Sequence, residues 1–64
     1  MGAFTNYQMN VRSGPGTTHS ALGQLPAGVG LILEARNADT SWVLVHTEDN
    51  ALRGWVASLY LRFS

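Results

Sequence analysis

The side chains that could perform acid–base or metal chemistry in this sequence are two histidines and four carboxylates. Enzymatic use of such groups needs a nucleophile or base beside an orienting partner, and no recognisable pairing of that kind is present. Neither histidine has a second histidine or a carboxylate at a metal-ligand spacing, and cysteine is absent. We therefore predict a protein that is not an enzyme and has no metal site and no cofactor. The residues considered are His19, His46, Glu34, Asp39, Glu48 and Asp49.

Two turn sequences resemble ion-binding loops but lack essential parts. Glu48, Asp49 and Asn50 follow one another, yet they offer fewer oxygens than the roughly six to eight that calcium takes. A solvated hairpin tip is the expected role of that turn. The Ser-Gly-Pro-Gly sequence at 13–16 has no lysine after it and no predicted helix behind it, so a phosphate cradle is not expected there.

Aromatic side chains are the remaining candidates for recognition. A domain of 64 residues is too small to bury all of them, so some are expected to face solvent. Trp42 and Tyr60 each have two open roles, a ligand contact or a cover over the edge of the core. For Trp55, which precedes Val56 in a predicted strand, structural packing is the favoured role. The aromatic residues are Phe4, Tyr7, Trp42, Trp55, Tyr60 and Phe63.

Charge and hydropathy exclude two classes of partner. The four basic residues are all arginines and balance four acidic residues, which leaves no basic surface for nucleic acid or anionic lipid. No apolar stretch approaches the roughly 20 residues of a membrane span. The start Met1-Gly2-Ala3 has no apolar leader core and is typical of a domain taken from a longer protein. We expect residues 1–64 to form one domain of a larger chain, without nucleic acid binding or membrane insertion.

Turn-forming residues divide the chain into short segments in which apolar and polar residues alternate, a pattern typical of strands. A flat sheet of this size would expose two edges and too many apolar side chains, so a small barrel is favoured. The class is all-β, with five to six short antiparallel strands and one 3-10 turn at 58–60, which Ser58 is suited to cap. Gly30 suggests a bulge, and Gly54 a point of close approach. Strands are expected at 8–12, 21–25, 29–36, 42–47 and 53–57, closed by 61–63. The predicted core consists of Val11, Leu25, Leu31, Leu33, Val43, Val45 and Val56.

Four blocks in this chain resemble the bacterial SH3 domain family in order and approximate spacing. They are Asn-Val-Arg-Ser-Gly-Pro-Gly at 10–16, Gly-Gln-Leu-Pro-Ala-Gly at 23–28, Trp42, and Gly-Trp-Val-Ala-Ser-Leu-Tyr-Leu at 54–61. The resemblance runs from about Met9 to Leu61. It implies an SH3-like barrel and an accessory binding module, often found beside cell-wall hydrolases.

Comparison with eukaryotic SH3 domains suggests where a ligand would lie. Trp42 resembles their groove tryptophan and Tyr60 their groove tyrosine, while Ala57 stands where those domains usually carry proline. The segment 13–23 has no acidic residue to anchor a basic Pro-rich peptide, so that ligand is not expected. The predicted ligand-binding residues are Trp42, Tyr60 and Ala57, with Ser13, Thr17 and His19 from the loop 13–20.

The resemblance implies two roles that the residues leave open. In the first, the domain is a non-catalytic module that recognises a peptidoglycan peptide or cross-bridge. In the second, it is a structural domain that packs on a neighbouring catalytic domain of its parent and shapes that enzyme's substrate groove. Both imply a protein of the cell envelope or extracellular space, and the isolated domain is expected to be a monomer.

Overall fold

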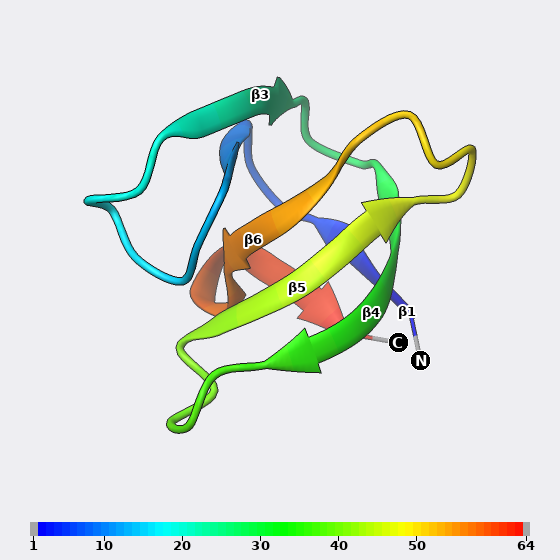
Figure 1. Ribbon diagram of the computed structural model, residues 1–64. Helices are drawn as coiled ribbons and strands as arrows, with labels where there is room; N and C mark the ends of the chain where they lie inside the picture. The colour runs from blue at the N-terminus through cyan, green and yellow to red at the C-terminus, as the bar shows by residue number, and fades with distance from the viewer. Residues whose placement is uncertain (1, 64) are drawn as a thin grey trace.

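The computed structural model describes residues 2–63 and contains only strands and one short 3-10 helix in that range (Figure 1). Each strand is short and ends at a turn rich in glycine, proline, serine or asparagine. None of the helical structure within 2–63 is long and apolar enough to cross a membrane. The elements are β1 (Gly2–Thr5), β2 (Met9–Arg12), β3 (Ala21–Leu25), β4 (Gly30–Arg36), β5 (Trp42–Thr47), β6 (Arg53–Ala57), η1 (Ser58–Tyr60) and β7 (Leu61–Phe63).

All paired strands are antiparallel and form one sheet in the order β3-β2-β6-β5-β4-β1-β7. The sheet curls, so that β5 and β6 cross one side of the molecule and β1 and β7 the other (Figure 1). A single hydrophobic cluster joins residues from both sides. This arrangement is the small SH3-like fold that the strand pattern and the sequence resemblance predicted.

The core is made of the inward-facing side chains of the curled sheet. Val43 pairs with Val56, and both are almost completely inaccessible to water. Val45, which also faces inward, pairs with Gly54. Burying a valine side chain stabilises a fold by about 1.5 to 3 kcal/mol relative to leaving it exposed. The buried apolar residues are Ala3, Met9, Val11, Leu25, Leu31, Val43, Val45, Val56 and Leu61.

Two predictions about strands and core were incomplete. The strand β1 was not predicted, because the first strand was expected at 8–12; it supplies Ala3 to the core and pairs with β4 and β7. Leu33 was predicted to be buried and is only partly so. Strand β4 loses register between Leu33 and Ala35, which turns this end of the strand away from the core. The register irregularity of β4 therefore lies between Leu33 and Ala35. Gly30 pairs regularly with Phe4, so the bulge predicted at Gly30 was wrong.

Close approach at Gly54 is confirmed, because a Cβ on that residue would lie 2.7 Å from the backbone oxygen of Arg12. The 3-10 helix Ser58–Tyr60 is also confirmed, but its predicted cap is wrong. Ala57 precedes the helix without a side-chain cap, and the Ser58 hydroxyl instead donates to the Thr40 carbonyl at 2.6 Å. This bond ties η1 to the turn between β4 and β5.

Candidate functional site

A groove of about 600 Å³ lies where the loop 13–20, the turn 37–41 and η1 meet. In Figure 1 these three segments all lie at the left of the molecule, at one end of β5. The lining combines aromatic and aliphatic side chains with a few polar groups, as is typical of ligand grooves. It is formed by Tyr7, Gln8, Met9, Asn10, Arg12, Thr17, Ser41, Trp42, Ala57, Leu59 and Tyr60.

Trp42 is half-buried in this groove, on the outer face of the sheet. Its neighbour Val43 faces the core, so the alternation of β5 directs Trp42 outward as predicted. The turn 37–41 fixes its backbone, because the Trp42 amide donates to Asn37 Oδ1 and the Asn37 amide donates to the Trp42 carbonyl, each at 3.0 Å. The ring therefore stands on a rigid strand end beside Ala57, its cross-strand partner.

The turn 37–41 is itself held by a carboxylate. The Ser41 hydroxyl donates to Asp39 Oδ1 at 2.7 Å, and the Ser41 amide donates to the same oxygen at 3.1 Å. These bonds, the hydroxyl bond first, hold the pKa of Asp39 below its ordinary value of 3.8. The ionised carboxylate thus orders the turn that carries Trp42.

Two tyrosines form the opposite part of the lining. The Tyr7 and Tyr60 rings meet edge to face, with centroids 5.9 Å apart and planes at 85°. Both tyrosines are exposed, with 61% and 46% of the residue surface accessible to water. The Asn6 amide donates to the Tyr60 carbonyl at 3.0 Å, which fixes the two segments relative to each other. Exposed aromatic rings held in this way suit a binding surface, since little conformational entropy remains to be lost.

Arg12 connects the groove to the loop 13–20. Its Nη1 donates to the carbonyl of Thr17 at 3.3 Å and to that of His19 at 3.0 Å. The Ser13 amide closes the loop by donating to the Ser20 carbonyl at 2.9 Å. Arg12 thus holds the loop 13–20 in place at one side of the groove.

The structure brings together four of the six predicted ligand-binding residues: Trp42, Tyr60, Thr17 and Ala57 all line the groove. Ser13 and His19 do not. Ser13 closes the base of the loop, and the His19 ring lies over Gly14, where a Cβ would be 2.5 Å from Nδ1.

Several lining residues were not predicted to bind. Tyr7, Arg12 and Ser41 are the most distinctive of them, followed by Gln8, Met9, Asn10 and Leu59. The alternating pattern of strand β2 marked an outward face for Asn10 and Arg12, which was a usable signal. Tyr7 follows the unpredicted strand β1, so its place in the groove depended on an element that the sequence pattern did not reveal.

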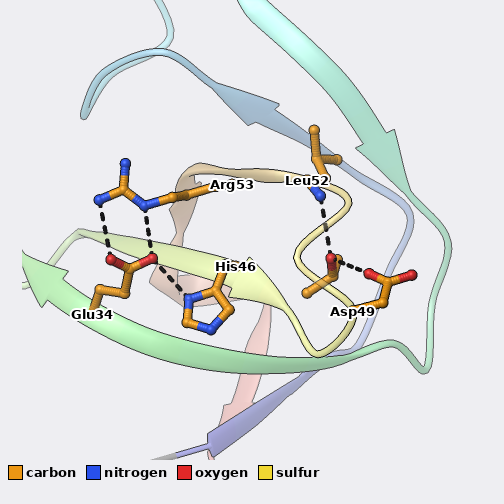
Figure 2. A network of polar contacts seen from close by, with 6 residues as sticks. Glu34, His46, Asp49, Leu52 and Arg53 are labelled. Atoms are coloured by element: carbon orange, nitrogen blue, oxygen red, sulfur yellow. Dashed lines mark hydrogen bonds and ion pairs between the residues drawn. The ribbon is translucent and has the colours of Figure 1, made fainter.

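A polar network on the outer face lies outside the groove lining (Figure 2). Arg53 donates through Nε to Glu34 Oε2 at 2.8 Å and through Nη2 to Glu34 Oε1 at 3.0 Å. His46 Nδ1 lies 2.8 Å from Glu34 Oε2. The Arg53 bonds, and then the His46 bond, hold the pKa of Glu34 below its ordinary value of 4.5. The pairing of His46 with Glu34 of the adjacent strand was not predicted from the sequence.

The side chains that line the groove provide aromatic, aliphatic and polar surface for a ligand. The groove lining contains one formal charge, Arg12, and no carboxylate. No group of three or more potential metal-ligating side chains gathers within residues 2–63.

Trp55, which was expected to pack structurally, does not line the groove. It is half-buried on the outer face of the sheet, opposite Leu44 and Arg12.

Comparison with known proteins identifies the family. The family model described as the bacterial SH3 domain matches residues 8–62, which is most of the chain. No curated protein and no solved structure gives a significant match. The matched range includes β2 to η1 and the groove residues from Gln8 to Tyr60. With this match, the curled sheet and the order of the sequence blocks, the chain belongs to the bacterial SH3 domain family, a family of small binding modules.

Proposed function

We propose that this domain is a non-catalytic recognition module that binds a peptide of peptidoglycan, either a stem peptide or a cross-bridge, in the groove between Trp42 and Tyr60. The observation that carries the proposal is the aromatic groove itself. Trp42 and the edge-to-face pair Tyr7 and Tyr60 stand on fixed backbone, outside the buried core, around one opening. Aromatic surface of this kind packs against an extended chain without needing charge on either partner.

Binding by one such groove is expected to be weak. A shallow site on a small domain suggests a Kd between micromolar and millimolar, or about −8 to −4 kcal/mol. Several linked copies in a parent protein would raise the avidity on a polymeric wall through effective concentration. Recognition of peptidoglycan also implies a protein of the cell envelope or the extracellular space, with the isolated domain acting as a monomer.

The test is binding to purified sacculi by the wild type and by matched aromatic variants. Tyr60→Ala and Trp42→Ala should each weaken binding about tenfold, as expected for residues at the centre of a site. Phe4→Ala is the control, because Phe4 is as exposed as Tyr60, at 48% against 46%, and does not line the groove. Absence of wild-type binding, or equal losses for Tyr60→Ala and Phe4→Ala, would reject the proposal.

The second candidate function is packing on a neighbouring domain of the same parent protein. A separate pair of exposed apolar side chains favours it: Phe4 and Ile32 are 48% and 39% exposed and come from β1 and β4. Gly2 of β1 pairs with Ile32, so the alternation of β1 places Phe4 and Ile32 on the same outer face of the sheet. Exposed apolar side chains that share one face often mark a protein contact.

The two candidates make opposite predictions for the variants. If the domain shapes the substrate groove of a neighbouring enzyme, deleting it should change that enzyme's specificity, and Phe4→Ala should reproduce part of the effect. The isolated domain should then show no binding to purified sacculi. Loss of sacculus binding in Tyr60→Ala, with no effect of Phe4→Ala on the parent enzyme, would favour the first candidate.

A further inference from the structure

The guanidinium group of Arg12 uses only some of its hydrogen-bond donors in its contacts with the loop 13–20. Its Nη1 donates to the carbonyls of Thr17 and His19, at 3.3 and 3.0 Å, so both hydrogens on that nitrogen are used. The Nε and Nη2 donors have no partner among residues 2–63. Because the two loop bonds fix one edge of the planar guanidinium, the other edge is held in a defined orientation at the groove lining.

In Arg53 the same edge of the guanidinium group, Nε and Nη2, binds a carboxylate, which shows the kind of group that this edge accepts. Arg53 donates through Nε and Nη2 to the two carboxylate oxygens of Glu34, at 2.8 and 3.0 Å (Figure 2). This side-on arrangement matches two parallel donors to two acceptors and is a strong geometry for binding carboxylate. The free donors of Arg12 are the same pair of atoms.

Within residues 2–63, no side-chain carboxylate lines the groove or bonds to Arg12. The groove lining contains no acidic side chain. Glu34 is paired with Arg53, and Oδ1 of Asp39, the acidic residue nearest in sequence to the lining residue Ser41, accepts two hydrogen bonds from that serine. A cationic peptide would find no carboxylate in the lining, whereas an anionic one would meet a pre-oriented guanidinium.

We propose that Arg12 is the anion-recognising residue of the groove and that the ligand is an extended peptide with an ionised carboxylate. The carboxylate accepts hydrogen bonds from Nε and Nη2 of Arg12, while the apolar part of the peptide packs on Trp42 and on the tyrosine pair. This inference rests on the proposed function only in requiring that the groove bind a peptide. It adds the chemical feature that the peptide must carry.

The experiment measures binding of matched acidic and neutral peptides to the ¹⁵N-labelled domain by NMR. The first pair is acetyl-Ala-Gly-Ala-Gly-Ala as the free acid and as the C-terminal amide. The second pair has an amidated C-terminus and carries Glu or Gln at the central position. In at least one pair the acidic peptide should bind about fivefold tighter, a modest factor because solvent screens a half-exposed pair. It should also shift the Nε–H signal of Arg12, and the pair that responds identifies the carboxylate as terminal or side-chain.

Arg12→Gln separates recognition from the structural role of the same side chain. Looser packing of the loop would weaken the acidic and neutral peptides by the same factor, whereas loss of recognition removes the difference between them. Arg12→Lys keeps the charge without the planar pair of donors and should retain only part of the difference. Arg36→Gln is the control, because Arg36 is exposed at the end of β4 and does not line the groove. It should leave the difference unchanged.

Two results would overturn the inference. One is equal binding of the acidic and neutral members of both pairs, or no shift of the Arg12 Nε–H signal at peptide concentrations up to tens of millimolar. The other is an equal loss for acidic and neutral peptides in Arg12→Gln. Failure of the proposed function gives a different pattern, in which sacculi are not bound although the domain still distinguishes acid from amide.

Discussion

The hydroxyl group of Thr5 makes two hydrogen bonds inside the fold. Thr5 is the buried polar residue of the described chain, at 3% exposure, and its hydroxyl donates to the Pro26 carbonyl at 2.7 Å and accepts from the Val29 amide at 2.9 Å. These bonds join β1 to the turn before β4. Every buried side-chain nitrogen and oxygen within residues 2–63 has a hydrogen-bond partner.

Thr5→Val should therefore lower the free energy of unfolding by about 2 kcal/mol, because a buried donor and acceptor lose their partner. Urea denaturation followed by tryptophan fluorescence measures the change. Thr5→Ser is the matched control; it keeps the hydroxyl, loses one methyl group and should cost about 1 kcal/mol. Equal stability of Thr5→Val and the wild type would show that the hydroxyl bonds contribute nothing net.

For single residues, the sequence predicted correctly which side chains face the core wherever strand alternation decides it. Val43 and Val45 face the core, and Trp42 faces outward, because the period of two is a property of the strand itself. Tyr7 could not be placed in this way. Its contact with Tyr60 joins residues far apart in the sequence, and no local pattern carries such information.

Among the elements, the contact of β6 with β2 depends on the absence of a side chain at Gly54. A Cβ there would lie 2.6 Å from Val11 Cγ1 and 2.7 Å from the Arg12 carbonyl oxygen. The second of these atoms is backbone and cannot turn aside. Arg12, whose side chain holds the loop 13–20, is thus positioned by the packing of β6.

Gly54→Ala should destabilise the domain by about 3 kcal/mol, at the upper end of the usual cost of overpacking. Gly14→Ala is the control, because there the obstacle is the ring of His19, an exposed side chain that can rotate away. Its cost should stay within about 1 kcal/mol. The two variants are compared by thermal and urea unfolding, and equal costs would show that β2 moves freely away from β6.

Strand pairing was predictable in part. Six of the seven strands were expected from turn residues and alternation, with ends within one residue of those observed. The seventh, β1, has only four residues, in which alternation is too short to predict a strand. The register shift in β4 also escaped prediction, because alternation assumes an unbroken ladder, and Leu33 was therefore assigned to the core.

For the whole molecule, hydrogen bonds to carboxylates make stability depend on pH. The pKa of Glu34, Asp39 and Asp49 is lowered in the folded protein, chiefly by hydrogen bonds from Arg53, Ser41 and Thr47 respectively. A carboxylate with a lowered pKa favours folding in its ionised form. Its contribution is complete above the ordinary values of 4.5 and 3.8 and is lost as pH falls through the folded-state values.

The melting temperature should therefore be steady near neutral pH and fall as the solution is acidified below about pH 5. Glu34→Gln should make this fall shallower, because one of the titrating groups is removed. Scanning calorimetry at several pH values measures both. The difference between variant and wild type should shrink at acid pH, where Glu34 is protonated in both the folded and unfolded states. A constant difference across the range would contradict the linkage.

The strands β1 and β7 lie side by side, with Ala3 opposite Phe63, and the Tyr7–Tyr60 pair lies beyond the other end of this ladder. Ala3 and Phe63, which lie near the two ends of the described range 2–63, are thus separated by about one strand spacing, roughly 5 Å. A surface loop of another protein could accept the whole domain with little change in its own span. The groove would then face away from the junction, so the domain can be transplanted as a unit and keep its binding surface accessible.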